Sequence, residues 1–210
     1  MVDDVVGKPW KFTYTLELPK SEKELRFGDS RNHGRIRWAV NKATRLGVQV
    51  RPAETQDDLR AWYELYVDTM RWHASLPRPY RFLKALWELL RPRGLMQLLL
   101  AEQQEGGSRS LLAGSVFLMF GQTVYYYLNG RRRGALALRP NDAILWRAIH
   151  DACRMGFRRY DLGEVDEDQQ GLTEFKLKWG AKAIQSYRYY YPPLREVEPH
   201  SLQSSGHIYR

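Results

Sequence analysis

One feature constrains the fold of this chain more than any other: its hydrophobic period changes near residue 94. Before that point, apolar side chains recur three and four residues apart, as is typical of amphipathic helices. After it, strand-length apolar runs follow one another across turn signals at Gly106-Gly107 and Gly121-Gln122, which predicts β-hairpins. Helical patterns combined with hairpin strands favour a mixed α/β sheet over a helical bundle.

The complete pattern predicts an alternation of helices and strands. The expected helices cover residues 30–46, 56–70, 80–90, 140–155 and 172–179. The expected strands cover residues 10–18, 48–51, 95–102, 111–120, 123–129, 157–163 and 183–191. From residue 47 onward the order is β-α-α-β-β-β-α-β-α-β, which predicts an α/β fold with one mixed sheet and flanking helices.

Several classes of protein are disfavoured by composition. The longest apolar runs, such as residues 98–101, are far shorter than the roughly 18 residues of a membrane span. The first seven residues are acidic and lack the apolar stretch of a secretory signal. A single cysteine, Cys153, excludes an internal disulfide, and the five histidines lack metal-ligand spacing. We therefore expect a cytoplasmic protein without a metal site or a membrane span.

The chain is strongly basic, and the excess charge is clustered. Thirty-three Lys and Arg residues against 24 Asp and Glu give a net charge of +9. One cluster lies between Lys20 and Arg45, and a second comprises Arg131, Arg132, Arg133 and Arg139. Such clusters attract polyanions such as nucleic acids, nucleotides and anionic membranes. A merely solvated basic surface is the alternative for each.

Four stretches in the second half of the chain resemble a known family when taken in order. They are Leu138-Arg-Pro-Asn-Asp-Ala-Ile-Leu-Trp146, Gly156-Phe-Arg-Arg-Tyr-Asp-Leu-Gly163, Gly171-Leu-Thr-Glu-Phe-Lys-Leu-Lys-Trp-Gly-Ala181 and Tyr189-Tyr-Tyr-Pro192. This set resembles the Fem family of peptidoglycan interpeptide-bridge aminoacyltransferases and its GNAT-like relatives, over roughly residues 10–193. The resemblance implies a GNAT-like fold and transfer of an aminoacyl or acyl group to an amine of a cell-wall precursor or related acceptor.

The resemblance also implies a domain organisation. Members of the Fem family usually carry two GNAT-like domains, and the segment before Gly47 is too short to be the first. We expect residues 1–46 to be a strand and a basic linker helix, the remnant of a first domain. Residues 47–193 would form the GNAT-like domain and residues 194–210 a flexible tail. The expected partner is a missing first domain or another copy of the chain.

Lys176 is the candidate catalytic cation. In the resembling family, the lysine that follows a phenylalanine stabilises the acyl-transfer intermediate, and Phe175 and Lys176 occupy these positions. An ammonium steered by a neighbouring aromatic ring suits such a role. The alternative is a surface lysine on a short helix, with Lys178 two residues away and expected to point elsewhere.

The basic loop before residue 140 is the candidate anion site. Coenzyme A-using GNAT enzymes have Arg or Gln here, followed by two spacers, Gly, a spacer, and Gly or Ala. In this chain Arg131 and Gly134 fit, whereas Leu136 would crowd the backbone approach. Arg139 and Asn141 could still hold a phosphate. We expect an anion site without tight coenzyme A binding, or else a simple basic turn.

Further candidates surround these two sites. Tyr126, Tyr127 and Asn129 lie on the strand that lines the acyl cleft in the GNAT layout. Asp161 and Glu164 follow on the next strand and could orient an amine, with Asp161 preferred because strand-end acids such as Glu164 are common caps. The expected contacts to phosphates of tRNA or of a nucleotide-linked precursor come from a helix face carrying Arg35 and Arg37.

Three functions remain open from sequence. The first is a Fem-type N-acyltransferase, with aminoacyl-tRNA or acyl-coenzyme A as donor and no certain cofactor. The second is a coenzyme A-dependent GNAT N-acetyltransferase, which the substitution at Leu136 disfavours. The third is a non-catalytic half-domain that binds RNA or a partner subunit, which Lys176 argues against.

Overall fold

The computed structural model describes residues 5–105, 108–166 and 169–191, and it contains the expected elements. The helices are α1 (Ser30–Arg45), α2 (Gln56–Trp72), α3 (Tyr80–Leu90), α4 (Pro140–Arg154) and α5 (Gln170–Lys178). The strands are β1 (Val6–Glu17), β2 (Val48–Pro52), β3 (Met96–Glu105), β4 (Ser108–Phe120), β5 (Thr123–Arg131), β6 (Arg159–Val165) and β7 (Lys182–Tyr190). The predicted α/β fold is confirmed; the Gly106-Gly107 turn and the tail 194–210 lie outside the described residues.

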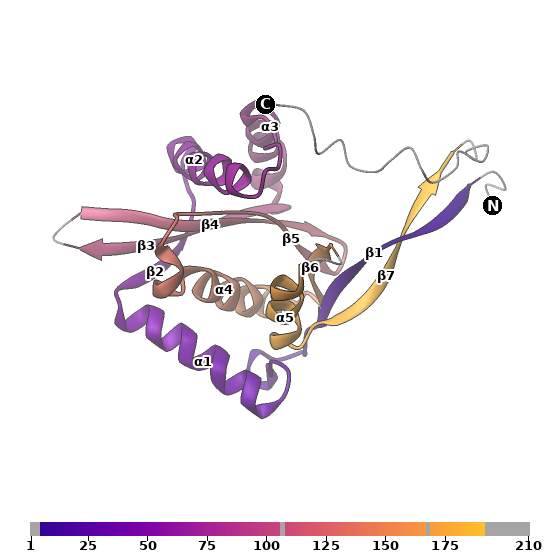
Figure 1. Ribbon diagram of the computed structural model, residues 1–210, viewed down its shortest axis with the longest axis horizontal. Coiled ribbons are helices and arrows are strands. Elements are labelled where there is room, and N and C mark those ends of the chain that lie inside the picture. The colour runs from indigo at the N-terminus through magenta and orange to yellow at the C-terminus, as the bar shows by residue number, and fades with distance from the viewer. Residues whose placement is uncertain (1–4, 106–107, 167–168, 192–210) are drawn as a thin grey trace.

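All seven strands form one mixed sheet in the order β2-β3-β4-β5-β6-β1-β7. Neighbouring strands are antiparallel except for β5 and β6, which are parallel. Helices α2 and α3 cover one face, and α4 and α5 cover the other with α1 packed outside α4 (Figure 1). The parallel pair requires a crossover connection, which α4 supplies.

Each face of the sheet carries its own hydrophobic cluster. On the α4 side, buried residues include Phe27, Ile36, Ile149, Tyr160 and Trp179. On the α2 side, buried residues include Leu59, Trp62, Leu83, Trp87 and Val116. The two clusters hold the helices against both faces of the sheet.

Helix α2 begins and packs through specific contacts. Thr55 caps it, and the Thr55 and Asp58 side chains complete a capping box, which stabilises the first turn. Trp62 donates from Nε1 to the Gly114 carbonyl at 2.8 Å. A Cβ atom added to Gly130 of β5 would lie 2.6 Å from the Tyr66 nitrogen, so α2 approaches β5 as closely as backbones allow. This contact sets the position of α2 beside the end of β5.

The amino-terminal segment is integral to the sheet. Strand β1 lies between β6 and β7, with Leu16↔Tyr160 on one side and Thr13↔Ile184 on the other. The fully buried Ile36 of α1 joins the core on the α4 side. Residues 6–45 therefore share a sheet and a core with the rest of the chain. Their interpretation as a remnant of a first domain stays a prediction.

Candidate active site

The site lies where β5 and β6 separate. These parallel strands pair from Thr123↔Arg159 to Tyr125↔Asp161. No pair between them beyond Tyr125 occurs among the described residues. Just beyond, β5 bulges against β4, because Val116 faces Leu128 and Phe117 faces Tyr126, leaving Tyr127 as the extra residue. A cavity of about 890 Å³, here called the splay cavity, opens at this point.

Most of the predicted site residues line this one cavity. They are Tyr126, Tyr127, Asn129, Arg131, Arg139, Asn141, Phe175 and Lys176. Tyr126 packs with Phe117 on the α4 side, whereas Tyr127 packs on the α2 side. The cavity is therefore lined by side chains from both faces of the sheet, at the point where β5 and β6 stop pairing.

Lys176 is buried at the wall of the splay cavity. Its side chain is held by hydrogen bonds from Nζ to the Gly163 carbonyl at 2.8 Å and to the Glu164 carbonyl at 3.0 Å. Only 4% of the residue is exposed, so the alternative of a surface lysine is wrong. Burial lowers the pKa of Lys176 from 10.5 to about 8, although the negative charges of Asp161 and Glu164 oppose this shift. The third ammonium proton remains for a ligand.

Asp161 shapes the wall from behind. Its Oδ1 accepts hydrogen bonds from the Thr13 hydroxyl at 2.6 Å and from the Gly163 amide at 2.7 Å. Gly163 has a φ of 81°, and a Cβ there would lie 3.6 Å from the Tyr126 carbonyl and 3.9 Å from Lys176 Nζ. Asp161 is not among the lining residues. It acts on the site through Gly163, whose carbonyl holds Lys176.

Lys178 was expected to point away from the site, and that expectation is wrong. It lines the splay cavity and donates from Nζ to Oδ1 of the buried Asp142 at 2.8 Å. The last turn of α5 faces the first turn of α4, and the long side chain spans the two helices. Phe175 packs edge-on against Trp179, with Lys178 Nζ 4.9 Å from the Phe175 ring centre. Among the described residues, the Phe175 ring pairs with Trp179 and not with a tyrosine of β7.

A polar chain crosses the floor of the cavity. The Asn129 side-chain amide donates to Ser115 Oγ at 3.0 Å and to Asn141 Oδ1 at 3.4 Å. Ser115 in turn donates to the Tyr126 hydroxyl at 3.3 Å, and burial raises the pKa of that phenol. This hydrogen-bonded chain joins β4, β5 and the start of α4, so it fixes the side chains of Tyr126, Asn129 and Asn141 at the cavity wall.

The opposite end of the cavity is basic. Arg131 and Arg139 line it and are oriented by the rings of Trp72 and Trp38, at 5.3 Å and 5.7 Å. Arg139 adopts a left-handed conformation with a φ of 59° where α4 begins. This strained backbone turns the chain from the basic loop into the helix.

The start of α4 fits a coenzyme A pyrophosphate poorly. The Asp142 carboxylate lies in the first turn, and Leu136 lines the cavity beside it. Because Lys178 already pairs with Asp142, the obstacle to a pyrophosphate is Leu136, whose side chain crowds the backbone approach that a small residue would leave open. An anion in this cavity would depend mainly on Arg131 and Arg139.

The two arginines of α1 that were expected to contact phosphates, Arg35 and Arg37, lie in different surroundings. Arg35 lines a smaller cavity of about 430 Å³, which shares Gly171, Phe175 and Lys178 with the splay cavity. Arg37 is exposed elsewhere on the helix, where its charge helps burial and Arg26 to lower the pKa of His33. The structure thus brings Arg35 near the site and leaves Arg37 on the outer surface.

Sequence reasoning missed the contribution of α2. Tyr66, Thr69, Met70 and His73 all line the splay cavity. The Thr69 hydroxyl accepts from the Arg131 amide at 2.9 Å, which anchors the end of β5. Nothing in the helical pattern of α2 distinguishes residues that face a ligand from residues that face the core.

Cys153 is the remaining residue with reactive chemistry that sequence analysis singled out. Among the described residues, no three His, Cys, Asp or Glu side chains are grouped as metal ligands. In the same part of the chain, no helix is long and apolar enough to cross a membrane. Cys153 is buried, 3.3 Å from the Pro19 carbonyl, and burial raises the pKa of its thiol. It packs as a core residue, as its position on the apolar side of α4 indicated.

The sheet order, the separated parallel pair and the helix that follows a basic loop define the GNAT class of acyltransferase folds. The family model described as the acetyltransferase (GNAT) domain matches residues 30–177, and the chain belongs to this family. No curated protein matches the chain.

Solved structures share the fold at low sequence identity. FemX superposes with a TM-score of 0.72 at 17% identity, over 89% of this chain and 62% of that one. L-PGS from Bacillus licheniformis gives 0.63 at 11% identity, over 92% and 63%. The C-terminal domain of a protein assigned as a lysylphosphatidylglycerol synthetase, from Agrobacterium fabrum, gives 0.59 at 13%, over 88% and 61%. The chain spans about three-fifths of each, and the GNAT-like fold predicted from the Fem resemblance is confirmed.

Proposed function

We propose that this chain is an N-acyltransferase of the Fem/GNAT type, which passes an aminoacyl or acyl group to an amine of a cell-wall precursor or related acceptor. One observation carries the proposal. Lys176 is buried where β5 and β6 separate, with two of its protons held by carbonyl groups. A buried ammonium whose position is fixed by two hydrogen bonds is preorganised to stabilise an oxyanion.

The reaction would proceed by direct attack. The neutral amine nitrogen attacks the donor carbonyl carbon, forming the C–N bond while the carbonyl oxygen becomes negative. Lys176 stabilises this oxygen with its third proton, and the bulged peptide at Tyr127 borders the same space. Collapse breaks the C–O bond of an ester or the C–S bond of a thioester. The attacking nitrogen loses a proton, and the leaving group gains one.

The donor would bind through its phosphates at the basic end. Arg131 and Arg139 offer paired donors suited to phosphate, while Leu136 crowds the loop where coenzyme A-using enzymes carry a small residue. This arrangement supports an aminoacyl-tRNA donor. The family match supports the second candidate, a coenzyme A-dependent N-acetyltransferase. The buried Lys176 argues against a non-catalytic module, because burying an unused charge costs stability.

A two-donor transfer assay tests the proposal. One arm contains radiolabelled aminoacyl-tRNAs and the other radiolabelled acetyl-coenzyme A, each with a nucleotide-linked cell-wall precursor and simple primary amines. Amide products are identified by mass spectrometry. We expect transfer in the first arm, reduced by Arg139→Ala. Transfer in the second arm alone would favour the acetyltransferase, and none in either would contradict the enzymatic proposal.

A further inference from the structure

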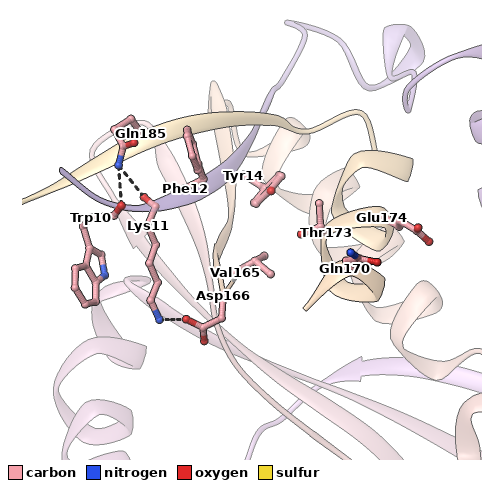
Figure 2. A pocket seen from close by; sticks show the side chains of 10 residues that line it. All are labelled: Trp10, Lys11, Phe12, Tyr14, Val165, Asp166, Gln170, Thr173, Glu174 and Gln185. Atoms are coloured by element: carbon pink, nitrogen blue, oxygen red, sulfur yellow. Dashed lines mark hydrogen bonds and ion pairs between the residues drawn. The ribbon is translucent and has the colours of Figure 1, made fainter. Parts of the chain in front are cut away.

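A second cavity lies on the other side of Lys176 from the basic loop. This outer cavity, of about 970 Å³, is bounded by β1, β7, the end of β6 and α5 (Figure 2). Tyr14 forms part of its wall, and Lys176 Nζ is 5.6 Å from the Tyr14 ring centre. Gln170 lines both cavities. The outer cavity has no part in the donor site proposed above.

The walls of the outer cavity are largely aromatic, and Glu174 of α5 is the one lining charge without an ion pair among the described residues. Trp10 and Phe12 are 38% and 48% exposed, although both side chains are large and apolar. Lys11 forms an ion pair with Asp166, which cancels both charges (Figure 2). The basic end of the splay cavity differs sharply, because Arg131 and Arg139 suit an anion. The outer cavity suits an uncharged, partly apolar group.

Glu164 lies where the two cavities meet. Its Oε2 accepts from Trp10 Nε1 at 3.1 Å, and its Oε1 accepts from the Ser186 hydroxyl at 3.0 Å. Its own backbone carbonyl is one of the two that hold Lys176. Glu164 lines the splay cavity, and Trp10 lines the outer one. Strands β1 and β7 thus place a carboxylate beside the candidate catalytic ammonium.

The Glu164 carboxylate retains capacity for a ligand. A carboxylate has about four lone-pair sites, and these two hydrogen bonds occupy one on each oxygen. Trp10 is itself fixed, because the Arg188 guanidinium lies 3.2 Å from its ring centre. Asp142, the other acid that lines the splay cavity, is already paired with Lys178. Of the two acids that line the splay cavity, Glu164 is therefore the one available to receive a cation, on the side where Trp10 connects it to the outer cavity.

We propose that the outer cavity is the acceptor site and that Glu164 binds the primary ammonium of the acceptor. The part of the acceptor that enters the outer cavity is an uncharged, partly apolar chain that ends in a primary amine. Its body lies against Trp10 and Phe12, and its ammonium, held at Glu164, gives one proton to solvent before the neutral nitrogen attacks the donor carbonyl beside Lys176. The proposal rests on the proposed acyl transfer and assigns its acceptor side.

The test uses n-hexylamine as a probe, with 1-hexanol as the uncharged analogue. Binding to the full chain at pH 7 is followed by NMR through the indole N–H signals, with that of Trp10 assigned by Trp10→Phe. We expect both compounds to shift the Trp10 signal, and hexylamine to do so at about tenfold lower concentration, because only its ammonium is held by Glu164. Glu164→Gln should weaken hexylamine binding about tenfold, because a charged hydrogen bond becomes a neutral one.

Two variants control the experiment. Glu17→Gln removes the same charge from the far end of β1, where Glu17 pairs with the exposed Arg159, and should leave binding unchanged. Glu164→Asp keeps the charge but withdraws it by one methylene, and should weaken binding about threefold even if the glutamine variant folds poorly. Equal loss in the Glu17 variant would overturn the proposal.

The outcomes separate the acceptor site from the transfer reaction. An unmoved Trp10 signal, or equal binding of hexanol, would overturn the acceptor assignment whatever the transfer assay shows. Hexylamine binding that depends on Glu164 would support the assignment. If such binding occurs while no donor arm yields an amide, the acyl-transfer proposal fails and the ammonium site stands.

Discussion

Replacing Lys176 by Met separates the structural from the chemical role of this side chain. A pKa held at about 8 instead of 10.5 means that the folded state loses roughly 3 kcal/mol in keeping the ammonium charged. Met removes this cost, but leaves the Gly163 and Glu164 carbonyls without their donor, at about 1–3 kcal/mol each. The net loss should be roughly 1 kcal/mol and no more than about 3 kcal/mol.

The effect on transfer should be much larger. Removing one oxyanion donor usually lowers turnover by about 10²–10³. Stability is measured by thermal unfolding, where a loss of 1 kcal/mol corresponds to roughly 2–4 °C for a chain of this size. Turnover is measured in the donor arm that supports transfer. A folded variant with nearly unchanged melting and at least a hundredfold lower kcat is the expected result.

The matched control is Lys182→Met, because Lys182 is exposed at the start of β7. Lys178→Met is unsuitable, since it strips the buried Asp142 of its partner. If the Lys176 and Lys182 variants transferred equally well, the ammonium would have no part in the reaction. The assignment of Lys176 by family resemblance would then be refuted.

Further predictions concern packing, pH and charge. Gly130→Ala should cost about 1–3 kcal/mol in denaturant unfolding, because its Cβ would strike the backbone of α2. Transfer should decline above about pH 8 as Lys176 loses its proton, while stability rises from pH 8 to 10.5, where the unfolded chain binds that proton more tightly. Hydrogen bonds from Arg51 hold the pKa of Asp58 well below the usual 3.8, so the stability that this ion pair contributes is present above pH 3.8 and is lost in acid. Asp58→Asn should therefore lower the free energy of unfolding by about 2 kcal/mol at pH 7, measured by urea unfolding. Anisotropy titrations with tRNA should weaken steeply with salt, and replacing Arg35 and Arg37 together should flatten the slope by about 1.4; a slope near zero in the parent would mark a solubilising surface.

Local elements were predictable because their signals are local. Thr55 followed by Asp57 and Asp58 marks the start of α2, and the structure contains the capping box. Gly121-Gln122 marks the hairpin between β4 and β5. The position of β1 between β6 and β7 was not predictable, because its pairs join residues such as Thr13 and Ile184 without any local sign of the partner.

The same contrast between local signals and long-range contacts applies to the site. The resemblance selected Lys176, and the topology explains its position beside the end of β6. Sequence alone ranked Asp161 above Glu164, because acids near the end of a strand, such as Glu164, are common caps. Their roles differ because Asp161 meets Thr13 and the Gly163 amide, whereas Glu164 meets Trp10 and the cavity. Such differences arise from β1, which is remote in sequence.

The place of β1 in the sheet also governs how the protein is made. A ribosome delivers β1 first, yet both of its neighbours, β6 and β7, emerge more than 140 residues later. During synthesis the strand must wait with its hydrogen-bonding groups unpaired, exposed to water and to other nascent chains. Contacts of such long range slow folding, so the half of the sheet that carries Glu164 should mature last. The sheet would then close around Glu164 only after β7 has left the ribosome.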